Sequence, residues 1–388
     1  MPDALCPSAD DRARHLRWLL HLTQIPTAAG REHRVIDWIT RWAAERPLVA
    51  ISADACGNLT LRRTDEPPSA SPLYFTAHLD HPAFAVERVT GTDTLELSFR
   101  GGVMDAYFTD ASVTLHAAPG PIRARLTGKQ PQASPADLFP IYTAITESPH
   151  HAAPGDVAVW DVPAAEVLEG RVHTLACDDL AALAAALAAF DVLLRASPTG
   201  CVRLLLTRAE EIGFVGAIGA CRSATIPRGS RLIALENSRA FAESPIGAGP
   251  IVRVGDRLSI FSPALTAAIA RRAEEHASSN PGWKWQRKLM AGGACEASVF
   301  CQAGFEATCV CLPLGNYHNM GDLDAVQAGS NTTPPRVARE CIGLSDFEGL
   351  VDLLIACGER LGSGPSLTER FDKLWDQRRV VLEPPATV

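Results

Sequence analysis

The sequence predicts an α/β fold that carries a small β-rich insertion. Short apolar runs such as Leu204–Leu206 are typical of strands buried on both faces of a sheet, and segments with helical spacing of apolar residues lie between such runs. From Arg88 to Gly170 the pattern changes to short alternating segments interrupted by Gly and Pro, which favours a compact β-rich unit. We therefore expect a discontinuous α/β domain, residues 1–87 and 171–388, around a β-rich domain of residues 88–170.

The expected elements follow one another along the chain as this fold class requires. Helices are expected over residues 12–24, 33–45, 180–195, 263–276, 294–302, 345–360 and 367–378. Strands of the α/β part are expected near residues 49–52, 59–62, 73–77, 203–207, 230–235, 283–289 and 308–312. Strands of the insertion are expected near residues 94–98, 112–116, 122–126 and 155–160.

The composition is that of a folded, acidic protein. Hydrophobic residues make up 47% of the 388 residues and charged residues 21%, which is typical of globular chains. A net charge of −8 argues against a nucleic-acid partner, and no apolar run approaches the length of a membrane span. The N-terminus lacks the pattern of a secretory signal, and eleven cysteines fit reduced thiols. We therefore expect a cytoplasmic protein without a membrane partner.

Two adjacent carboxylates, Glu210 and Glu211, follow the apolar run at 204–206. Like charges side by side repel each other, whereas a site can use one to bind a metal and the other to move a proton. An exposed pair in a strand-to-helix loop is the alternative interpretation. A nucleotide loop is excluded, because Gly213 and Gly216 lack the dinucleotide-binding spacing and two acids would repel a pyrophosphate.

Two further acidic motifs flank predicted elements. His78 follows the strand at 73–77 and precedes Asp80 by two residues, so the carboxylate can accept the second N–H of a ligating imidazole. A purely structural His–Asp pair is equally compatible with this spacing. Asp178 and Asp179 precede the helix at 180–195, where an N-cap explains one aspartate but does not require two.

A potential ligand thus follows one predicted element after another. These residues are His78, Asp178, Glu210 with Glu211, Glu236 and His318. Because sites in α/β sheets gather at the carboxyl ends of the strands, we expect these side chains to converge.

The order of these residues resembles that of the two-zinc aminopeptidases. It is most similar to the tetrahedral aminopeptidases, a group of glutamyl or deblocking aminopeptidases also described as endoglucanase-like. That group carries a β-rich domain between its first ligand histidine and its Asp-Asp pair, where residues 88–170 lie here. The resemblance extends over roughly residues 12–358 and implies a three-layer α/β/α sheet of the zinc-exopeptidase type.

The resemblance also implies a ligand set and a reaction. Two divalent ions per chain are expected, zinc or, in the same geometry, cobalt or manganese. Asp178 would bridge the ions and the others would bind one ion each: His78 and Glu236 the first, Glu211 and His318 the second. Glu210 would be the general base that acts on a metal-activated water, Asp80 would orient His78, and Asp179 would support the adjoining turn. The substrate would be a small peptide cleaved at its N-terminal residue, and the chain would form a homo-oligomer.

Three departures from the group's pattern bear on substrate preference and assembly. Glu296 replaces a usual Asp, and after His318 the usual Ser-Pro-x-Glu sequence is absent and residues 320–339 form an extra loop. Glu236 also stands where the group usually has Asp, which keeps a second class of enzyme open. One alternative is a related zinc-dependent deacylase or carboxypeptidase that acts on N-acyl amino acids or peptides. The other is a catalytically silent metal-binding or assembly protein on the same fold.

Overall fold

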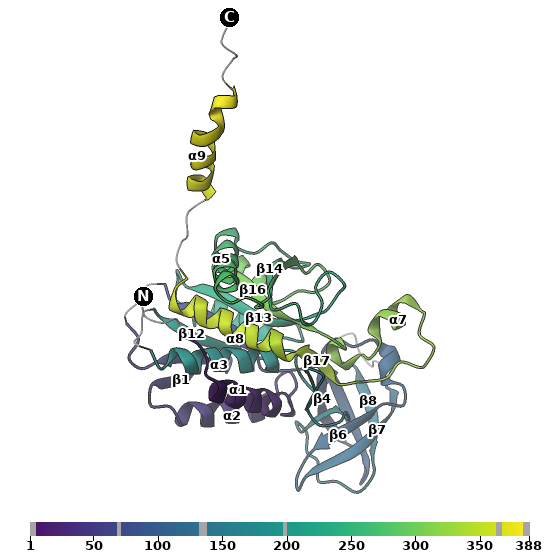
Figure 1. Cartoon of the computed structure of the whole chain (residues 1–388). Coiled ribbons are helices and arrows are strands. Elements are labelled where there is room, and N and C mark those ends of the chain that lie inside the picture. Colours follow the sequence, from purple (N-terminus) through teal and green to yellow (C-terminus); the bar gives the residue numbers. More distant parts are fainter. Residues whose placement is uncertain (1–4, 68–70, 132–137, 197–199, 362–366, 383–388) are drawn as a thin grey trace, which may run out of the picture.

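An eight-stranded sheet forms the centre of the molecule (Figure 1). The computed structural model describes residues 5–67, 71–131, 138–196, 200–361 and 367–382. The sheet has the order β1-β2-β12-β3-β13-β16-β14-β15. Its members are β1 (Val49–Ala53), β2 (Leu59–Arg63), β3 (Leu73–His78), β12 (Val202–Thr207), β13 (Arg231–Arg239), β14 (Ile251–Gly255), β15 (Gln286–Leu289) and β16 (Glu306–Leu314).

The middle of this sheet is parallel. Strands β12, β3, β13 and β16 run in one direction, so their carboxyl ends meet along one edge of the sheet. The antiparallel strands β2 and β14 flank these four. All six residues of β3 are buried, as expected for a strand covered on both faces.

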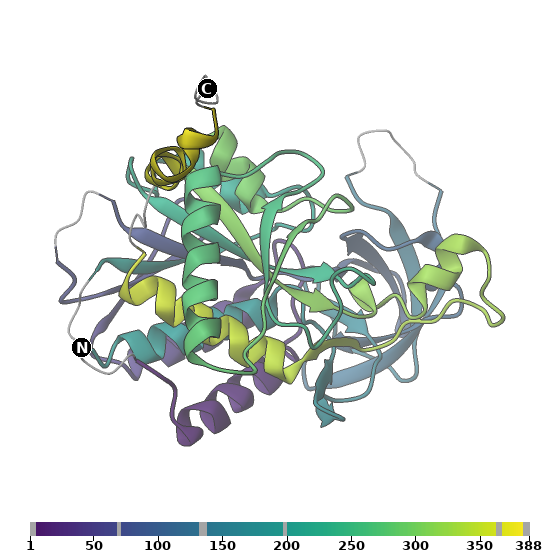
Figure 2. The ribbon, with the colours of Figure 1, turned by 45° about the horizontal axis from the view of Figure 1, so that its top comes forward.

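Helices cover both faces of the sheet, which confirms the expected three-layer arrangement. The helices are α1 (Ala9–Leu22), α2 (His33–Ala44), α3 (Leu180–Leu193), α4 (Val215–Arg222), α5 (Pro263–Ser279), α6 (Glu296–Gln302), α7 (Leu323–Ala328), α8 (Leu344–Glu359) and α9 (Leu367–Arg378). Helix α3 packs on β3 and β13 and against α1 and α8, while α4 and α6 pack on the opposite face (Figure 2).

Helix α3 is the most deeply buried helix of that layer. Its sequence is apolar on every side, and only Asp191 and Leu193 among its residues are not fully buried. The many alanines allow α1, α8 and the sheet to approach α3 closely. Helix α3 is therefore buried on all sides, because it is enclosed by α1, α8 and the sheet.

The insertion is a closed barrel of order β4-β5-β8-β7-β6-β9. Its strands are β4 (Ala83–Val89), β5 (Thr94–Arg100), β6 (Ser112–His116), β7 (Pro121–Lys129), β8 (Ile141–Thr146) and β9 (Val157–Trp160). Aromatic rings fill its interior, with Phe84 in contact with Phe99 and Trp160, and Phe108 stacked on Tyr142. This confirms a small β domain. Its boundaries at 88 and 170 remain a prediction.

Shorter elements complete the described part of the chain. The strands β10 (Glu166–Leu168), β11 (Arg171–Thr174) and β17 (Glu340–Gly343) form a three-stranded sheet, and the 3-10 turns are η1 (Asp105–Phe108), η2 (Tyr317–Asn319) and η3 (Arg379–Leu382). Helix α7 lies beside the barrel, whereas α9 stands away from the body of the molecule (Figure 1). Across the described ranges, no helix combines the length and the apolar character needed to cross a membrane.

Candidate active site

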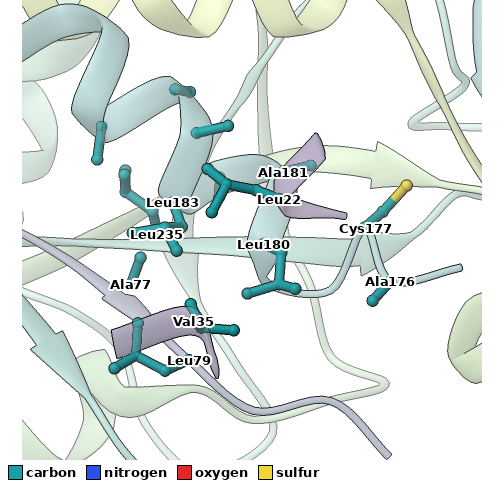
Figure 3. Packing of buried hydrophobic residues seen from close by; sticks show 14 of the residues in the cluster. Leu22, Val35, Ala77, Leu79, Ala176, Cys177, Leu180, Ala181, Leu183 and Leu235 are labelled. Carbon is teal, nitrogen blue, oxygen red and sulfur yellow. The ribbon is translucent and has the colours of Figure 1, made fainter. Parts of the chain in front are cut away.

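Three of the candidate ligands, His78, Asp178 and Glu236, have neighbours along the chain that are anchored in the core. Side chains alternate along an extended chain, so Ala77 and Leu79 point into the core on either side of His78 (Figure 3). Leu235 does the same before Glu236, and Cys177 before Asp178. The apolar cluster of Figure 3 therefore fixes the backbone positions from which these three polar side chains emerge.

The structure brings together all five predicted ligands, and Asp178 lies between the two histidines. Asp178 Oδ1 is 3.3 Å from His78 Nε2, and Asp178 Oδ2 is 3.4 Å from His318 Nε2. The first side of the cluster is completed by Glu236, whose Oε1 is 3.8 Å from His78 Nε2. The second side is completed by Glu211, whose Oε1 is 3.4 Å from His318 Nε2.

These donors fit divalent cations. The ligand atoms of His78, Asp178 and Glu236, and those of Asp178, Glu211 and His318, form two groups that share Asp178, and within each group they lie within 4.8 Å of one another. Buried Asp178 Oδ1, Glu211 Oε1 and His318 Nε2 form no hydrogen bond. Imidazole nitrogens and carboxylate oxygens are the donors that zinc, cobalt and manganese accept.

The electrostatics of the cluster also favour bound cations. Burial, and then the neighbouring Asp178 carboxylate, raise the pKa of Glu236 to about 8, and burial raises that of Glu211 to about 8 as well. The pKa of His318 is raised to about 10, because Glu211 and Asp178 outweigh the effect of burial. Without cations, therefore, the cluster holds protons to limit its negative charge. Bound cations would replace those protons.

Asp80 and Asp179 hold the backbone around the ligands. The carboxylate of Asp80 accepts hydrogen bonds from the backbone N–H groups of Glu210 (2.9 Å) and Glu211 (3.1 Å). His78 Nδ1 is 3.1 Å from the backbone oxygen of Asp80 and 3.6 Å from its carboxylate, so the carbonyl is the nearer acceptor. Asp179 accepts the backbone N–H of His78 (3.2 Å) and the Nδ2–H of Asn237 (2.8 Å).

Glu210 occupies the turn after β12 and is buried beside the ligands. A carboxylate oxygen of Glu210 lies within 4.8 Å of ligand atoms of His78 and Glu211. Burial raises the pKa of Glu210 well above its usual range, and Glu236, Glu211 and Glu296 act in the same direction. A carboxylate with a raised pKa beside a metal site is suited to accept and release a proton.

Sequence reasoning missed Glu340, which connects two of the candidate ligands. Its Oε2 accepts the backbone N–H groups of Cys177 (2.6 Å) and Asp178 (3.0 Å), and its Oε1 accepts that of His318 (2.8 Å). The extra loop separates Glu340 from His318, so the expected Ser-Pro-x-Glu spacing is absent. The signal that could have identified it is a lone Glu that begins the buried strand β17.

The barrel domain and its edges also contribute to the site. His318 Nδ1 donates to the backbone oxygen of Gly102 (2.6 Å), which leaves Nε2 directed at Asp178 and Glu211. His81, expected to be an ordinary loop residue, is buried, and its Nδ1 is 2.5 Å from the backbone oxygen of Asp178. Neither contact has a recognisable sequence signature.

A pocket of about 210 Å³ opens onto the cluster. One wall consists of residues from the end of β13 and from β14, and another of residues from the extra loop. Its lining residues beyond the ligands include Ser238, Arg239, Phe241, Arg253, Met290, Tyr317, Met320, Leu323 and Gln327. Peptide-sized groups can therefore reach the candidate ligands from solvent.

A doubly covered α/β sheet with two imidazoles and several carboxylates at its carboxyl edge defines a metal-dependent hydrolase. Residues 57–331 match the model of the M42 glutamyl aminopeptidase family, so the chain belongs to that family. It is a metal-dependent aminopeptidase and therefore a hydrolase of peptide bonds. The deacylase or carboxypeptidase and the silent protein are not favoured.

Solved structures share the fold at low sequence identity. The TET1 peptidase of Pyrococcus horikoshii, which can assemble into a tetrahedron or a large octahedral shell, is 22% identical, with a TM-score of 0.69, and the match covers 89% of this chain and 99% of that one. An aminopeptidase from the archaeon Desulfurococcus kamchatkensis is 20% identical, with a TM-score of 0.71 and coverage of 90% and 95%. An endoglucanase from Thermotoga maritima is 18% identical, with a TM-score of 0.63 and coverage of 88% and 96%. No curated protein matches the chain.

Proposed function

We propose that this aminopeptidase works with two divalent metal ions per chain. Zinc is the proposed metal for both sites, and cobalt and manganese are the alternatives. His78 and Glu236 would hold one ion, Glu211 and His318 the other, and Asp178 both. The observation that carries this proposal is that the two carboxylate oxygens of Asp178 face different imidazoles, at 3.3 Å and 3.4 Å. Bound cations of this kind lower the pKa of water and stabilise negative charge that develops on a carbonyl oxygen.

Side chains of the protein would transfer the proton of the attacking water. Glu210 is the proposed general base, which accepts a proton from the attacking water and delivers it to the leaving amine. Asp80 is the proposed positioning residue, because it fixes the backbone of both Glu210 and Glu211. This assignment changes the expected role of Asp80, since its carboxylate holds the Glu pair and its backbone carbonyl faces His78.

The remaining parts of the proposal concern the protein as a whole. Structural neighbours such as the TET1 peptidase assemble from several copies, which supports a homo-oligomer here as well. The free cysteines among the described residues, many of them buried, support a reducing compartment such as the cytoplasm.

Elemental analysis combined with a substrate panel tests the proposal. We expect two equivalents of metal per chain after purification with zinc. We also expect hydrolysis of aminoacyl anilides but not of N-acyl amino acids in the presence of zinc, cobalt or manganese. One equivalent of metal would disprove the two-ion assignment, and turnover of N-acyl substrates alone would favour a deacylase. Light scattering measures the number of subunits.

A further inference from the structure

Phe241 presents an aromatic ring at the pocket that opens onto the candidate metal site. It follows the end of β13, in a tight turn closed by backbone hydrogen bonds between Phe241 and Ser244. Of the apolar side chains that line the pocket, Phe241 is the most exposed, at 40%, whereas Met290, Met320 and Leu323 are buried. An aromatic ring beside a cavity is a large apolar surface that a ligand can cover.

Arg239 connects this ring to helix α7 of the extra loop. Its guanidinium carbon lies 5.3 Å from the centre of the Phe241 ring, which is a cation–π contact. Its Nη1 donates to Oε1 of Gln327 at 2.7 Å, and its Nη2 is paired with the carboxylate of Asp324. Because α7 already supplies partners for both of these nitrogens, Arg239 acts as a support for the ring.

Helix α7 is itself anchored on the barrel domain. The hydroxyl of Tyr107, in the 3-10 turn η1, donates to the backbone oxygen of Gly321 at 2.7 Å. Tyr107 also forms a buried apolar cluster with Met320 and Leu323. The loop is closed at its base by a hydrogen bond from the backbone N–H of Gly321 to the backbone oxygen of Arg336. The ring, the arginine and α7 therefore form a connected frame, which reduces the cost of ordering the ring when a ligand binds.

We infer that Phe241 is a specificity-determining contact for an apolar side chain of the peptide substrate, and that Arg239 is the residue that positions it. A side chain of the size of leucine can cover the ring, whereas that of alanine is too short to do so. Two side chains of a peptide lie next to the scissile bond, namely those of the N-terminal residue and of the residue that follows it. The inference rests on the proposed function, because it places the peptide in the pocket beside the metal ligands.

Two pairs of substrates distinguish these two side chains. Leucyl and alanyl anilides differ only in the N-terminal side chain. Alanyl-leucine amide and alanyl-alanine amide differ only in the side chain after the scissile bond. We expect the wild-type enzyme to prefer the leucine-containing member of at least one pair by about 10-fold or more in kcat/KM, because apolar pockets discriminate a single methylene group by about 10–200-fold. The pair that shows the preference identifies the side chain that the ring contacts.

Substitution of Phe241 tests the contact. In Phe241→Ala the preference should fall below about threefold, through a higher KM for the leucine-containing substrate, because a contact made equally in the ground state and the transition state appears in KM. Phe371→Ala is the matched control, because Phe371 is 60% exposed and lies on α9, away from the body of the molecule (Figure 1). It should retain the preference in full.

A double-mutant cycle tests the positioning role of Arg239. Arg239→Met should lower the preference in the otherwise wild-type enzyme and should have no further effect on it in Phe241→Ala, because Arg239 acts through the ring. Arg239→Lys should keep part of the preference, since it retains a cation that can face the ring. If Arg239→Met lowered the preference by the same factor with and without the ring, Arg239 would act independently of Phe241 and its positioning role would be disproved.

The possible results separate this inference from the proposed function. Equal rates within both wild-type pairs, with two metals bound, would overturn the inference alone. A Phe241→Ala variant that keeps the wild-type preference, or that slows both members of the pair alike, would also overturn it. Absence of turnover for all four substrates with zinc, cobalt and manganese would overturn the proposed function and the inference with it.

Discussion

Glu340 accepts the backbone N–H of His318 at 2.8 Å, from 22 residues further along the chain. Its other carboxylate oxygen accepts the N–H groups of Cys177 and Asp178. One buried side chain therefore fixes the relative positions of a histidine and an aspartate that face each other at 3.4 Å. The extra loop between His318 and Glu340 lengthens the connection without removing this contact.

Replacement of Glu340 by Ala should weaken both the fold and metal binding. Three buried N–H groups would lose their acceptor, at a cost of about 1–3 kcal/mol each. Because residues behind metal ligands typically contribute about 10–100-fold to affinity, we expect a comparable rise in the Kd for zinc. Denaturant unfolding and metal titration measure the two effects. Wild-type zinc affinity in a folded Glu340→Ala variant would contradict this role.

The side chains of the site could be predicted from the sequence, whereas the groups that hold them could not. His78, Asp178, Glu211, Glu236 and His318 each follow or end an apolar run, and parallel strands bring such positions together. The contact between His318 and Gly102 uses a backbone carbonyl, which any residue provides, so sequence does not mark it.

The exact ends of the strands also could not be predicted from the sequence. Glu236 was expected to follow a strand that ends at residue 235, but β13 continues to Arg239. The extension arises because β16 pairs with β13 along its whole length, up to Leu314. Pairing between distant segments is a tertiary effect that local patterns do not contain.

Gly216 should not tolerate a side chain. A Cβ at this position would overlap the backbone N and O of Arg208 and come within 2.6 Å of Asn58 Oδ1. The backbone of the turn that carries Glu210 would have to move, at a cost of about 1–3 kcal/mol. We expect Gly216→Ala to lower both the unfolding free energy and kcat. Gly120→Ala, where a Cβ meets open space, is the control and should change neither.

Asp191 should make the protein sensitive to acid. Burial raises the pKa of Asp191, but the nearby His15 ring, with Nε2 at 3.9 Å, and the hydrogen bonds from Arg14 and Arg46 outweigh burial and lower the pKa overall. A carboxylate with a depressed folded-state pKa stabilises the fold above its unfolded pKa of about 4, and this stabilisation is lost as the pH falls through the folded pKa.

We therefore expect Asp191→Asn to be less stable than wild type by roughly 2 kcal/mol at pH 7, with a difference that shrinks below pH ~4. Denaturant unfolding of both proteins, at pH 7 and below pH ~4, measures the difference in unfolding free energy. Asp37→Asn, on the exposed face of α2, should differ from wild type by less than about 0.5 kcal/mol. A pH-independent difference for Asp191→Asn would show that lost packing, and not the charge, is responsible.

Helix α9 should be dispensable for the fold of the single chain. It stands away from the body of the molecule, and its apolar residues Phe371 and Trp375 are 60% and 58% exposed (Figure 1). A chain that ends at Leu361 should keep the wild-type unfolding midpoint and kcat. A lower midpoint in the shortened chain, measured by calorimetry, would show that α9 packs on the body of its own or another copy.

Replacement of Glu210 by Gln separates proton transfer from metal binding. The Glu210→Gln substitution keeps the shape of the side chain and leaves the five proposed ligands unchanged, but an amide cannot accept the proton of the attacking water. We expect kcat to fall by about 10²–10⁴-fold with two metals still bound. Glu211→Gln, one residue further on, should instead lose metal, because the Oε1 of Glu211 faces His318 Nε2. Elemental analysis and anilide turnover on both variants measure the contrast. Near-normal turnover in Glu210→Gln would assign the base to another residue, and Glu296 would be the next candidate, because it is buried nearby and its pKa is raised by burial to about 7.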